Sequence, residues 1–309
     1  NTTGKNNVAV GSYSLYTNII GSSNSAVGFQ ALYNNTTSGN NAFGYKALFA
    51  NTTGYRNAAF GFAALQNNTI GVNNSAFGSY ALLNNTTGNQ NTAVGYQSLK
   101  ANTTGICNVA VGKDASYSNT FGSYNSVFGY QSMYNNVTGV NNSAFGYSAL
   151  YSNTTSNNSA FGYQSLFSNT IGTNNTAIGV VSLYYNTTGS HNTAVGRSSL
   201  VSNTIGIQNT AVGYESLITN TTGSNNTAVG FQSLYNNTVG NNHAFGYRSL
   251  QGNTTGSYNI AMGTNALYTN TIGSSNVAIG FETLFSGVSG VKNTAVGFQA
   301  LRSSLTSYN

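Results

Sequence analysis

The sequence is a tandem repeat of about 17 residues that runs from one end to the other. A pair such as A-V or A-F followed by glycine recurs eighteen times, mostly 17 residues apart and three times 16 residues apart. These repeat glycines are Gly11, Gly28, Gly44, Gly61, Gly78, Gly95, Gly112, Gly129, Gly146, Gly162, Gly179, Gly196, Gly213, Gly230, Gly246, Gly263, Gly280 and Gly297. A fixed short period indicates an architecture in which each unit packs on its neighbours. We therefore expect residues 1–309 to form one repeat array.

One asparagine position shows that the repeat is more than a biased composition. Counting the repeat glycine as position 1, the unit reads G-[YF]-x-[SA]-L-Y-x-N-T-T-G-x-x-N-T-A-[VF], and position 14 is asparagine in every copy. Asparagine side chains in stacked strands can hydrogen-bond to their own copies above and below. The sequence therefore predicts an internal asparagine ladder. Its members include Asn7, Asn24, Asn40, Asn57, Asn226, Asn276 and Asn293.

A period of 17 residues predicts an all-β fold, a parallel β-solenoid (β-roll) of about 18 coils. Repeats built from helices usually need more than about thirty residues. The N-T-A-V-G-Y stretch alternates small and large side chains as a strand does, and S-L-Y-x-N is expected to form a second short strand. The N-T-T-G segment is then a turn, in which Gly21, Gly54 and Gly71, or Ser38 and Ser156 in their place, supply a permissive backbone. Stacking at ~4.8 Å per coil predicts a rod on the order of 85 Å long.

The main strand is expected to contribute valine or phenylalanine to the core and to place alanine and glycine on its other face. The leucine at position 5 is expected to join that core. The predicted core residues include Val10, Val27, Phe43, Phe60, Leu99, Leu217 and Val229. Strands that are apolar on both faces are usually covered on both faces. The sequence therefore predicts self-association, as a homo-oligomer, a filament or both.

Charge is unusually scarce, and the fold explains why. Only 4% of the residues are charged, against roughly a quarter in ordinary globular proteins. A charge within the repeat would recur about every 4.8 Å along a stacked ladder and repel its own copies. Nine Lys and Arg spread over the chain make no basic patch, so we expect no nucleic-acid partner. No apolar run approaches the ~18 residues of a membrane span, so we expect no membrane insertion by this chain.

The units NTAVGYQSL and NNTAVGFQSL resemble the head repeats of YadA-like trimeric autotransporter adhesins, and they are similar to repeats in phage tail fibres. That family's repeats centre on an N-x-A-[IV]-G core, which Asn226, Ala228, Val229 and Gly230 match here, and the resemblance covers the whole chain. It implies a left-handed parallel β-roll, three chains side by side and display on a bacterial surface for attachment. The unit here is longer, because it adds a leucine and an N-T-T-G turn.

Residues that could carry catalytic chemistry are few and widely separated. Asp114, Glu215 and Glu282 share position 3, but the two glutamates lie four coils apart, about 19 Å at the ladder spacing. Hydrolysis by paired carboxylates needs about 5–9.5 Å. His191 and His243 lie three coils apart at different positions, so they cannot share a metal. We therefore assign no catalytic, cofactor-binding or metal-binding residue and predict that the chain is not an enzyme.

Aromatic side chains recur at position 2 and suggest two kinds of contact. The candidate contact residues at position 2 include Phe29, Tyr45, Tyr96, Tyr130 and Tyr214. Such a stripe could bind sugars, as part of a host-surface glycan, or pack against a neighbouring chain. Threonines at position 15 resemble the flat arrays of ice-binding solenoids, but valine, alanine, histidine and isoleucine interrupt them.

These patterns together predict a non-enzymatic, extracellular or cell-surface structural and adhesive fibre protein, without cofactors, whose main partner is itself. Both ends of the sequence still follow the repeat and show no atypical capping unit. End-to-end stacking of coils into a filament is therefore expected beside lateral association. The alternative is a trimeric adhesin head or a virion tail-fibre shaft that binds a host-surface glycan or protein. Ice or glycan binding by the solenoid ranks third.

Overall fold

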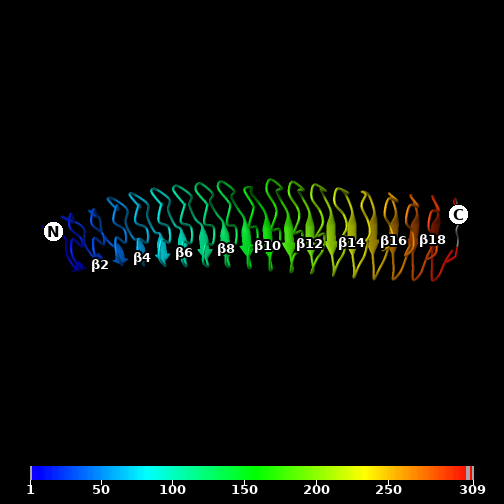
Figure 1. Ribbon diagram of the computed structural model, residues 1–309, viewed down its shortest axis with the longest axis horizontal. Helices are drawn as coiled ribbons and strands as arrows, with labels where there is room; N and C mark the ends of the chain where they lie inside the picture. The colour runs from blue at the N-terminus through cyan, green and yellow to red at the C-terminus, as the bar shows by residue number, and fades with distance from the viewer. Residues whose placement is uncertain (1, 304–306, 308–309) are drawn as a thin grey trace. The chain divides into compact units, whose positions relative to one another are not determined.

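The chain is an all-β protein with eighteen short strands, seen in a computed structural model that describes residues 2–303 and 307. It divides into two compact units, Asn1–Asn157 and Asn158–Asn309. Each unit is a parallel β-solenoid in which every repeat forms one coil, so the predicted fold class is confirmed (Figure 1). Among the described residues, no helix is long and apolar enough to cross a membrane.

Each unit contains nine strands of three residues. The strands of the first unit are β1 (Val8–Val10), β2 (Ser25–Val27), β3 (Asn41–Phe43), β4 (Ala58–Phe60), β5 (Ser75–Phe77), β6 (Thr92–Val94), β7 (Val109–Val111), β8 (Ser126–Phe128) and β9 (Ser143–Phe145). The strands of the second unit are β10 (Ser159–Phe161), β11 (Thr176–Ile178), β12 (Thr193–Val195), β13 (Thr210–Val212), β14 (Thr227–Val229), β15 (His243–Phe245), β16 (Ile260–Met262), β17 (Val277–Ile279) and β18 (Thr294–Val296).

Successive strands within a unit are parallel and in register, residue above equivalent residue. In the first unit, Ala93 of β6 pairs with Ala110 of β7, and in the second, Ala194 of β12 pairs with Ala211 of β13. The 16-residue spacings do not break this register, since Ala26 of β2 still pairs with Ala42 of β3. The missing residue is therefore absorbed in a turn and not in a strand.

The second strand expected at S-L-Y-x-N does not form. In the described coils this segment is a series of turns, and its leucine has a left-handed backbone, with φ of +49° at Leu99 and +53° at Leu217. Positions 3 and 13 are left-handed too, as at Gln97 and Cys107. Three left-handed residues per coil bend the chain back on itself, which a second extended strand could not do.

Left-handed backbone explains why position 5 holds leucine and never isoleucine or valine. A branched Cβ clashes with the backbone in this conformation more severely than an unbranched one does. Among the non-glycine residues with positive φ in the described part of the chain, only Val181 is β-branched. The leucine position thus combines an apolar side chain with a conformation that disfavours β-branched alternatives.

The core of each coil is formed by alanine and leucine. Ala93 and Leu99 are both 0% exposed, and Leu217 is equally buried, so the prediction for the two leucines is confirmed. The Oγ of Ser98, at position 4, donates to the Ala110 carbonyl at 2.8 Å. The opposite wall of the coil lies this close to the strand, so the inward position holds a small side chain: alanine in seventeen of the eighteen described strands and valine, Val127, in β8.

The predicted valine and phenylalanine core is therefore wrong, and the two faces of the strand are exchanged. Val10 is 57% exposed and Phe43 36% exposed, while Val27, Phe60 and Val229 are half-buried. In each strand, the residues before and after the inward one, at positions 15 and 17, point outward. The narrow interior is filled by the small side chain in the middle of each strand, so the bulky apolar column lies on the surface of both units.

The predicted asparagine ladder is confirmed and has a defined hydrogen-bond pattern. In most coils, the main-chain N–H of the position-14 asparagine donates to the side-chain Oδ1 of the position-14 asparagine one coil earlier, for example from Asn24 to Asn7 and from Asn57 to Asn40, both at 2.9 Å. The Nδ2 group donates to a turn carbonyl in the next coil, as from Asn226 to Val239 at 2.8 Å. Further members of the same ladder are Asn276 and Asn293, which are joined at 3.0 Å.

A second ladder is formed by the asparagines at position 8. The Nδ2 of Asn102 donates to Oδ1 of Asn85 at 2.8 Å and to the carbonyl of Gly105 at 3.0 Å. That carbonyl also accepts from Asn91 of the first ladder at 2.8 Å. The two ladders therefore meet at the turn carbonyl, and buried amide groups replace much of the apolar core.

The repeat glycines and the turn glycines are required for different reasons. Gly95 has φ of +127°, and a Cβ there would lie 2.6 Å from the carbonyl oxygen of Gly112. The turn glycine Gly54 does not have positive φ, so the expectation of a permissive corner is wrong there. In the 16-residue coil that begins at Gly28, Thr37 and not Ser38 takes the place of the turn glycine. The Nδ2 of Asn24 donates to the Thr37 carbonyl there, as the Nδ2 of Asn40 donates to the carbonyl of the turn glycine Gly54.

Candidate functional site: the outward strand face and the aromatic columns

The most continuous candidate surface is made by the outward side chains of the strands. We define the outward strand face as the first and third residues of every strand, which are positions 15 and 17 of the repeat. Position 17 is always valine, phenylalanine, isoleucine or methionine, and it is exposed or half-buried in every coil. Each unit therefore presents an unbroken line of nine apolar side chains to its surroundings.

Phenylalanines on this face stack on one another. The ring centroids of Phe43 and Phe60 are 4.7 Å apart and those of Phe60 and Phe77 are 4.9 Å apart, with planes within 7°. Phe128 and Phe145 stack in the same way at 4.7 Å. The rings follow the strand spacing, so in-register pairing fixes their orientation and leaves their edges toward solvent.

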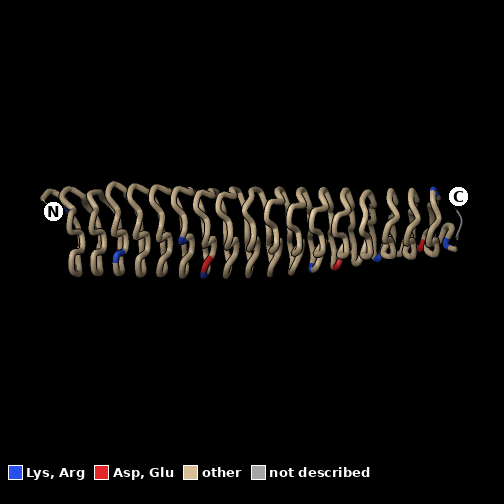
Figure 2. The backbone as a smooth tube through the Cα atoms, turned by 45° about the horizontal axis from the view of Figure 1, so that its top comes forward, with Lys and Arg blue, Asp and Glu red and all other residues tan. Residues whose placement is uncertain are grey.

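The outward strand face carries no formal charge in any of the eighteen described strands. Charged residues lie at other positions of the coil and occur singly or in pairs along both units (Figure 2). Contiguous exposed apolar surface of this kind is uncommon on isolated soluble proteins and usually marks an interaction site. The face is therefore suited to an uncharged, flat partner surface.

The predicted contact residues at position 2 form a second column beside this face. Tyr45 stacks between Phe29 and Phe62, with centroid distances of 5.5 and 4.8 Å. Tyr214 stacks on Phe231 at 5.3 Å. All these rings keep about 40% of their surface exposed. They contact one another along the column and remain open to a ligand or a second chain.

The other two predicted members of this column, Tyr130 and Tyr96, have different neighbours. Tyr130 stacks on Tyr147 at 5.2 Å. Tyr96 instead meets Tyr80 edge to face at 6.1 Å, because Tyr80 occupies position 3 and reaches in from the side. The column is thus interrupted where the repeat sequence changes.

Position 6 forms a third line of stacked rings. Tyr134 lies between Tyr117 and Tyr151, with centroids 4.9 and 5.3 Å apart. Burial of its hydroxyl raises the pKa of Tyr134, and burial likewise raises the pKa of Tyr184 in the second unit. These hydroxyls remain protonated at neutral pH, so the column presents neutral hydrogen-bonding groups.

Cations at position 3 lie between the aromatic columns of positions 2 and 6. The Nζ of Lys46 is 5.4 Å from the ring centroid of Tyr45 and 5.3 Å from that of Phe49. Arg248 lies 5.0 Å from the ring centroid of Tyr247. Cation–π contact of this kind stabilises a charge that has few acidic partners. The sparse positive charges are therefore placed on aromatic faces.

The ionisable residues considered for catalysis do not come together. No three His, Cys, Asp or Glu side chains among the described residues lie close enough to hold a metal ion. Glu215 accepts a hydrogen bond from Gln232 Nε2 at 2.8 Å, and a hydrogen bond with its carboxylate raises the pKa of Tyr214. Cys107 donates from Sγ to Gln90 Oε1 at 3.1 Å. These contacts lie within one coil or between adjacent coils.

The threonines considered for ice binding lie on the outward strand face at position 15, in register with one another. Thr193 of β12 pairs with Thr210 of β13, which pairs with Thr227 of β14. His243 and Ile260 follow in β15 and β16, so the row of hydroxyls ends there. A regular threonine array thus covers only part of the second unit.

The sequence comparisons supply no functional assignment. No protein-family model matches the chain, and no curated protein sequence matches it. Function is therefore inferred from the surfaces described above.

Proposed function

We propose that this chain is a non-enzymatic, extracellular structural and adhesive fibre protein that associates laterally with copies of itself through the outward strand face. The observation that carries the proposal is the uncharged line of apolar side chains along every strand of both units. Burial of apolar surface is the main driving force of association. Because the face carries no charge, it can be buried without leaving an unpaired ion in the interface.

A second copy of the chain is the occupant that fits this face best. The face repeats every coil, at ~4.8 Å, so only a partner with the same period can keep ring against ring along its whole length. A copy of the chain has that period by construction. The side chains of a partner without this period would no longer be aligned with those of the face after a few coils.

The area of the face agrees with this assignment. Nine coils at ~4.8 Å and a three-residue strand at ~3.3 Å per residue make a strip of about 43 by 10 Å, or roughly 430 Å², in each unit. Each strip therefore supplies roughly half of the ~800 Å² that each partner buries in a standard interface. The adjacent aromatic column would add to this area.

End-to-end association is the second mode in the proposal. Each coil pairs with the next through main-chain hydrogen bonds, and the same ladder is able to accept a coil from another molecule by strand addition. Filaments formed in this way would extend the axial repeat of the solenoid. The trimeric adhesin head or tail-fibre shaft remains the alternative, supported by the N-x-A-[IV]-G core that forms the strands.

Sedimentation velocity over a range of protein concentrations tests lateral association. The expected result is a concentration-dependent oligomer that Phe60→Lys weakens at least tenfold, because the variant places a charge in the centre of the face. The control is Thr87→Lys, which adds the same charge at an exposed turn position and should leave association unchanged. A monomer at all concentrations, or equal effects of the two variants, would overturn the proposal.

Electron microscopy of the same sample distinguishes the two assembly modes. Continuous fibres with a ~4.8 Å axial repeat support end-to-end assembly. Short rods with three chains in cross-section support the adhesin or tail-fibre alternative and contradict filament formation.

A further inference from the structure

The coil that begins at Gly28 is one residue short, and the structure shows where the residue is missing. Four residues separate Asn35 from Asn40, whereas five separate Asn51 from Asn57 in the following coil. The N–H of Gly39 donates to the Ser22 carbonyl at 3.0 Å, which places Gly39 at position 13. The omitted residue is therefore the one at position 10, between Ile20 of the preceding coil and Thr53 of the following one.

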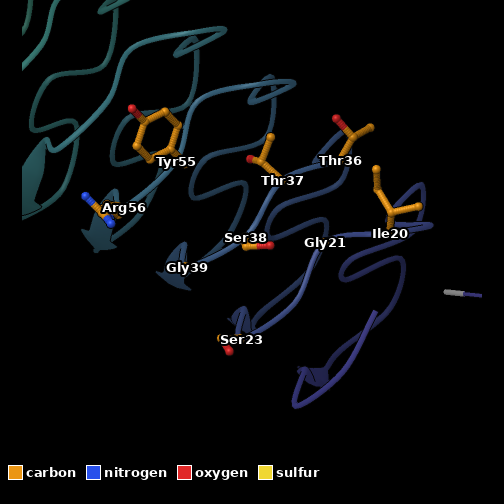
Figure 3. Close-up of a pocket in the computed structure, with 9 residues that line it drawn as sticks. All are labelled: Ile20, Gly21, Ser23, Thr36, Thr37, Ser38, Gly39, Tyr55 and Arg56. Atoms are coloured by element: carbon orange, nitrogen blue, oxygen red, sulfur yellow. The ribbon is translucent and has the colours of Figure 1, made fainter. Parts of the chain in front are cut away.

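This omission leaves a hollow of about 520 Å³ on the turn side of the first unit. Figure 3 shows Ile20 on one side and Tyr55 and Arg56 on the other, with the short turn between them. The remaining lining residues are Gly21, Ser23, Thr36, Thr37, Ser38 and Gly39. The hollow spans three coils, and coils separated by two steps lie about 9.6 Å apart. Its volume falls within the range of about 300–1,000 Å³ found for small-molecule sites.

The chemistry of the lining is that of a site for a polar anion with an apolar face. The Arg56 guanidinium lies 5.7 Å from the Tyr55 ring centroid, and no acidic side chain lines the hollow. Ser38 Oγ accepts from the Ser22 N–H at 2.9 Å, which leaves its hydroxyl hydrogen to donate. Thr36 donates to the Thr52 carbonyl, which leaves its oxygen lone pairs to accept.

We propose that this hollow binds a carboxylated sugar residue of the uronic acid type. A guanidinium pairs with a carboxylate through two parallel hydrogen bonds, the hydroxyls match sugar hydroxyls, and the Tyr55 ring and Ile20 cover the C–H face. A neutral sugar would leave Arg56 without a partner. A small inorganic anion would make no apolar contact with Tyr55 and Ile20.

The inference goes beyond the assembly role and does not depend on it, since the hollow lies in the turns and not on the outward strand face. A second hollow of about 380 Å³ in the other unit provides an internal comparison. It is lined by Tyr268 and Gln251 around Gly252, with no charged residue. A carboxylated sugar should not bind there.

The experiment is a titration of the intact chain with D-glucuronate, observed by NMR, with D-glucose and sodium acetate as comparison ligands. Glucuronate is expected to bind at least tenfold more tightly than either. Arg56→Gln and Tyr55→Ala should each weaken glucuronate binding at least fivefold. The matched controls Arg197→Gln and Tyr268→Ala should leave it unchanged, because both residues lie outside the hollow.

A second variant fills the hollow without removing any lining group. Insertion of one threonine between Thr36 and Thr37 restores the 17-residue length that most coils have, and it should abolish glucuronate binding. Binding that survives this insertion would overturn the proposal. So would equal binding of acetate, equal loss with Arg197→Gln, or the absence of any glucuronate-dependent change in the NMR spectrum.

Discussion

The main-chain N–H of Asn91 donates to the side-chain Oδ1 of Asn74 at 3.0 Å. Asn91 repeats the same arrangement one coil further, where its own Oδ1 accepts from the Asn108 N–H at 3.0 Å. Its Nδ2 donates to the Gly105 carbonyl. A single fully buried side chain therefore connects three coils. This connection explains why position 14 tolerates no substitution within the repeat.

Asn91→Ala should be strongly destabilising. The variant leaves the buried Asn108 N–H without its acceptor and removes one of the two donors to the Gly105 carbonyl. Each unsatisfied buried group costs about 1–3 kcal/mol, so we expect a loss of about 2–4 kcal/mol in the free energy of unfolding. Urea denaturation gives the total, and hydrogen exchange at Asn108 should show loss of protection.

The control for this variant is Thr87→Ala, an exposed turn substitution in the same coil that should change stability by less than about 0.5 kcal/mol. If Asn91→Ala were as mild as Thr87→Ala, the ladder would not be a source of stability. Unchanged exchange at Asn108 would lead to the same conclusion.

Leu99→Ile should destabilise the protein although it keeps the side-chain volume. Leu99 has φ of +49°, where a β-branched residue is a genuine outlier, so added backbone strain joins a repacking cost of up to about 1.5 kcal/mol. Leu99→Met should cost less than about 1.5 kcal/mol, because Met133 already occupies this position with the same φ.

Val94→Ile serves as the comparison for β-branching itself, since Val94 lies in a strand where branched residues are favoured. We expect it to be close to neutral in urea denaturation. Equal stability of Leu99→Ile and Leu99→Met would contradict the role assigned to the left-handed backbone.

The coil, the register and the asparagine ladder could be predicted from the sequence, because each requires the same residue type at the same position of every repeat. The sequence could not assign the faces of the strand. Alternation is satisfied equally well with Ala93 or with Val94 pointing inward, and the choice depends on how closely the opposite wall approaches. Ser98, which hydrogen-bonds to the Ala110 carbonyl, shows that the wall lies close enough to favour a small side chain, and Val127 is the largest that the described strands place there.

The missing second strand and the hollow near Arg56 were also beyond the sequence interpretation, although both left a signal. The strict absence of isoleucine and valine at position 5, where Leu99 lies, is the signal of a left-handed backbone. The 16-residue spacing after Gly28 is the signal of a shortened turn. Neither signal states by itself which residues line the surface that results.

Gly54 and Gly39 should respond differently to substitution. At Gly54, a Cβ would lie 2.4 Å from the Gly71 carbonyl oxygen and from Asn51 Oδ1, so both Ala and Asn should cost about 1–3 kcal/mol through overpacking. At Gly39, the space is open, with the nearest atom 3.8 Å away, and φ is +77°. Gly39→Ala should therefore cost about 1–2 kcal/mol through its backbone alone.

Gly39→Asn separates the two causes, because asparagine adopts left-handed backbone readily. We expect it to recover most of the stability that Gly39→Ala loses, whereas Gly54→Asn should be no better than Gly54→Ala. Urea denaturation of the four variants makes the comparison. Recovery by asparagine at Gly54 would show that conformation and not crowding selects that glycine.

Glu282 should titrate below the ordinary range of a glutamate. Arg302 Nε donates to its Oε2 at 2.7 Å and Gln299 Nε2 donates at 2.9 Å, and the bond from Arg302 is the main reason that the pKa of Glu282 is lowered. A lowered pKa in the folded state means that the fold favours the carboxylate. Its contribution to stability is therefore fully present above the ordinary pKa of glutamate and is lost as the pH falls through the lowered value.

The chain contains only two glutamates, Glu215 and Glu282, so carbon NMR of a glutamate-labelled sample can follow both carboxyl groups directly. Arg302→Gln should raise the pKa of Glu282, because it removes the strongest donor and its positive charge. Arg197→Gln, the matched loss of a cation elsewhere in the same unit, should leave Glu282 unaffected. An unchanged Glu282 titration in Arg302→Gln would mean that the ion pair is broken in solution, as solvent-exposed pairs often are.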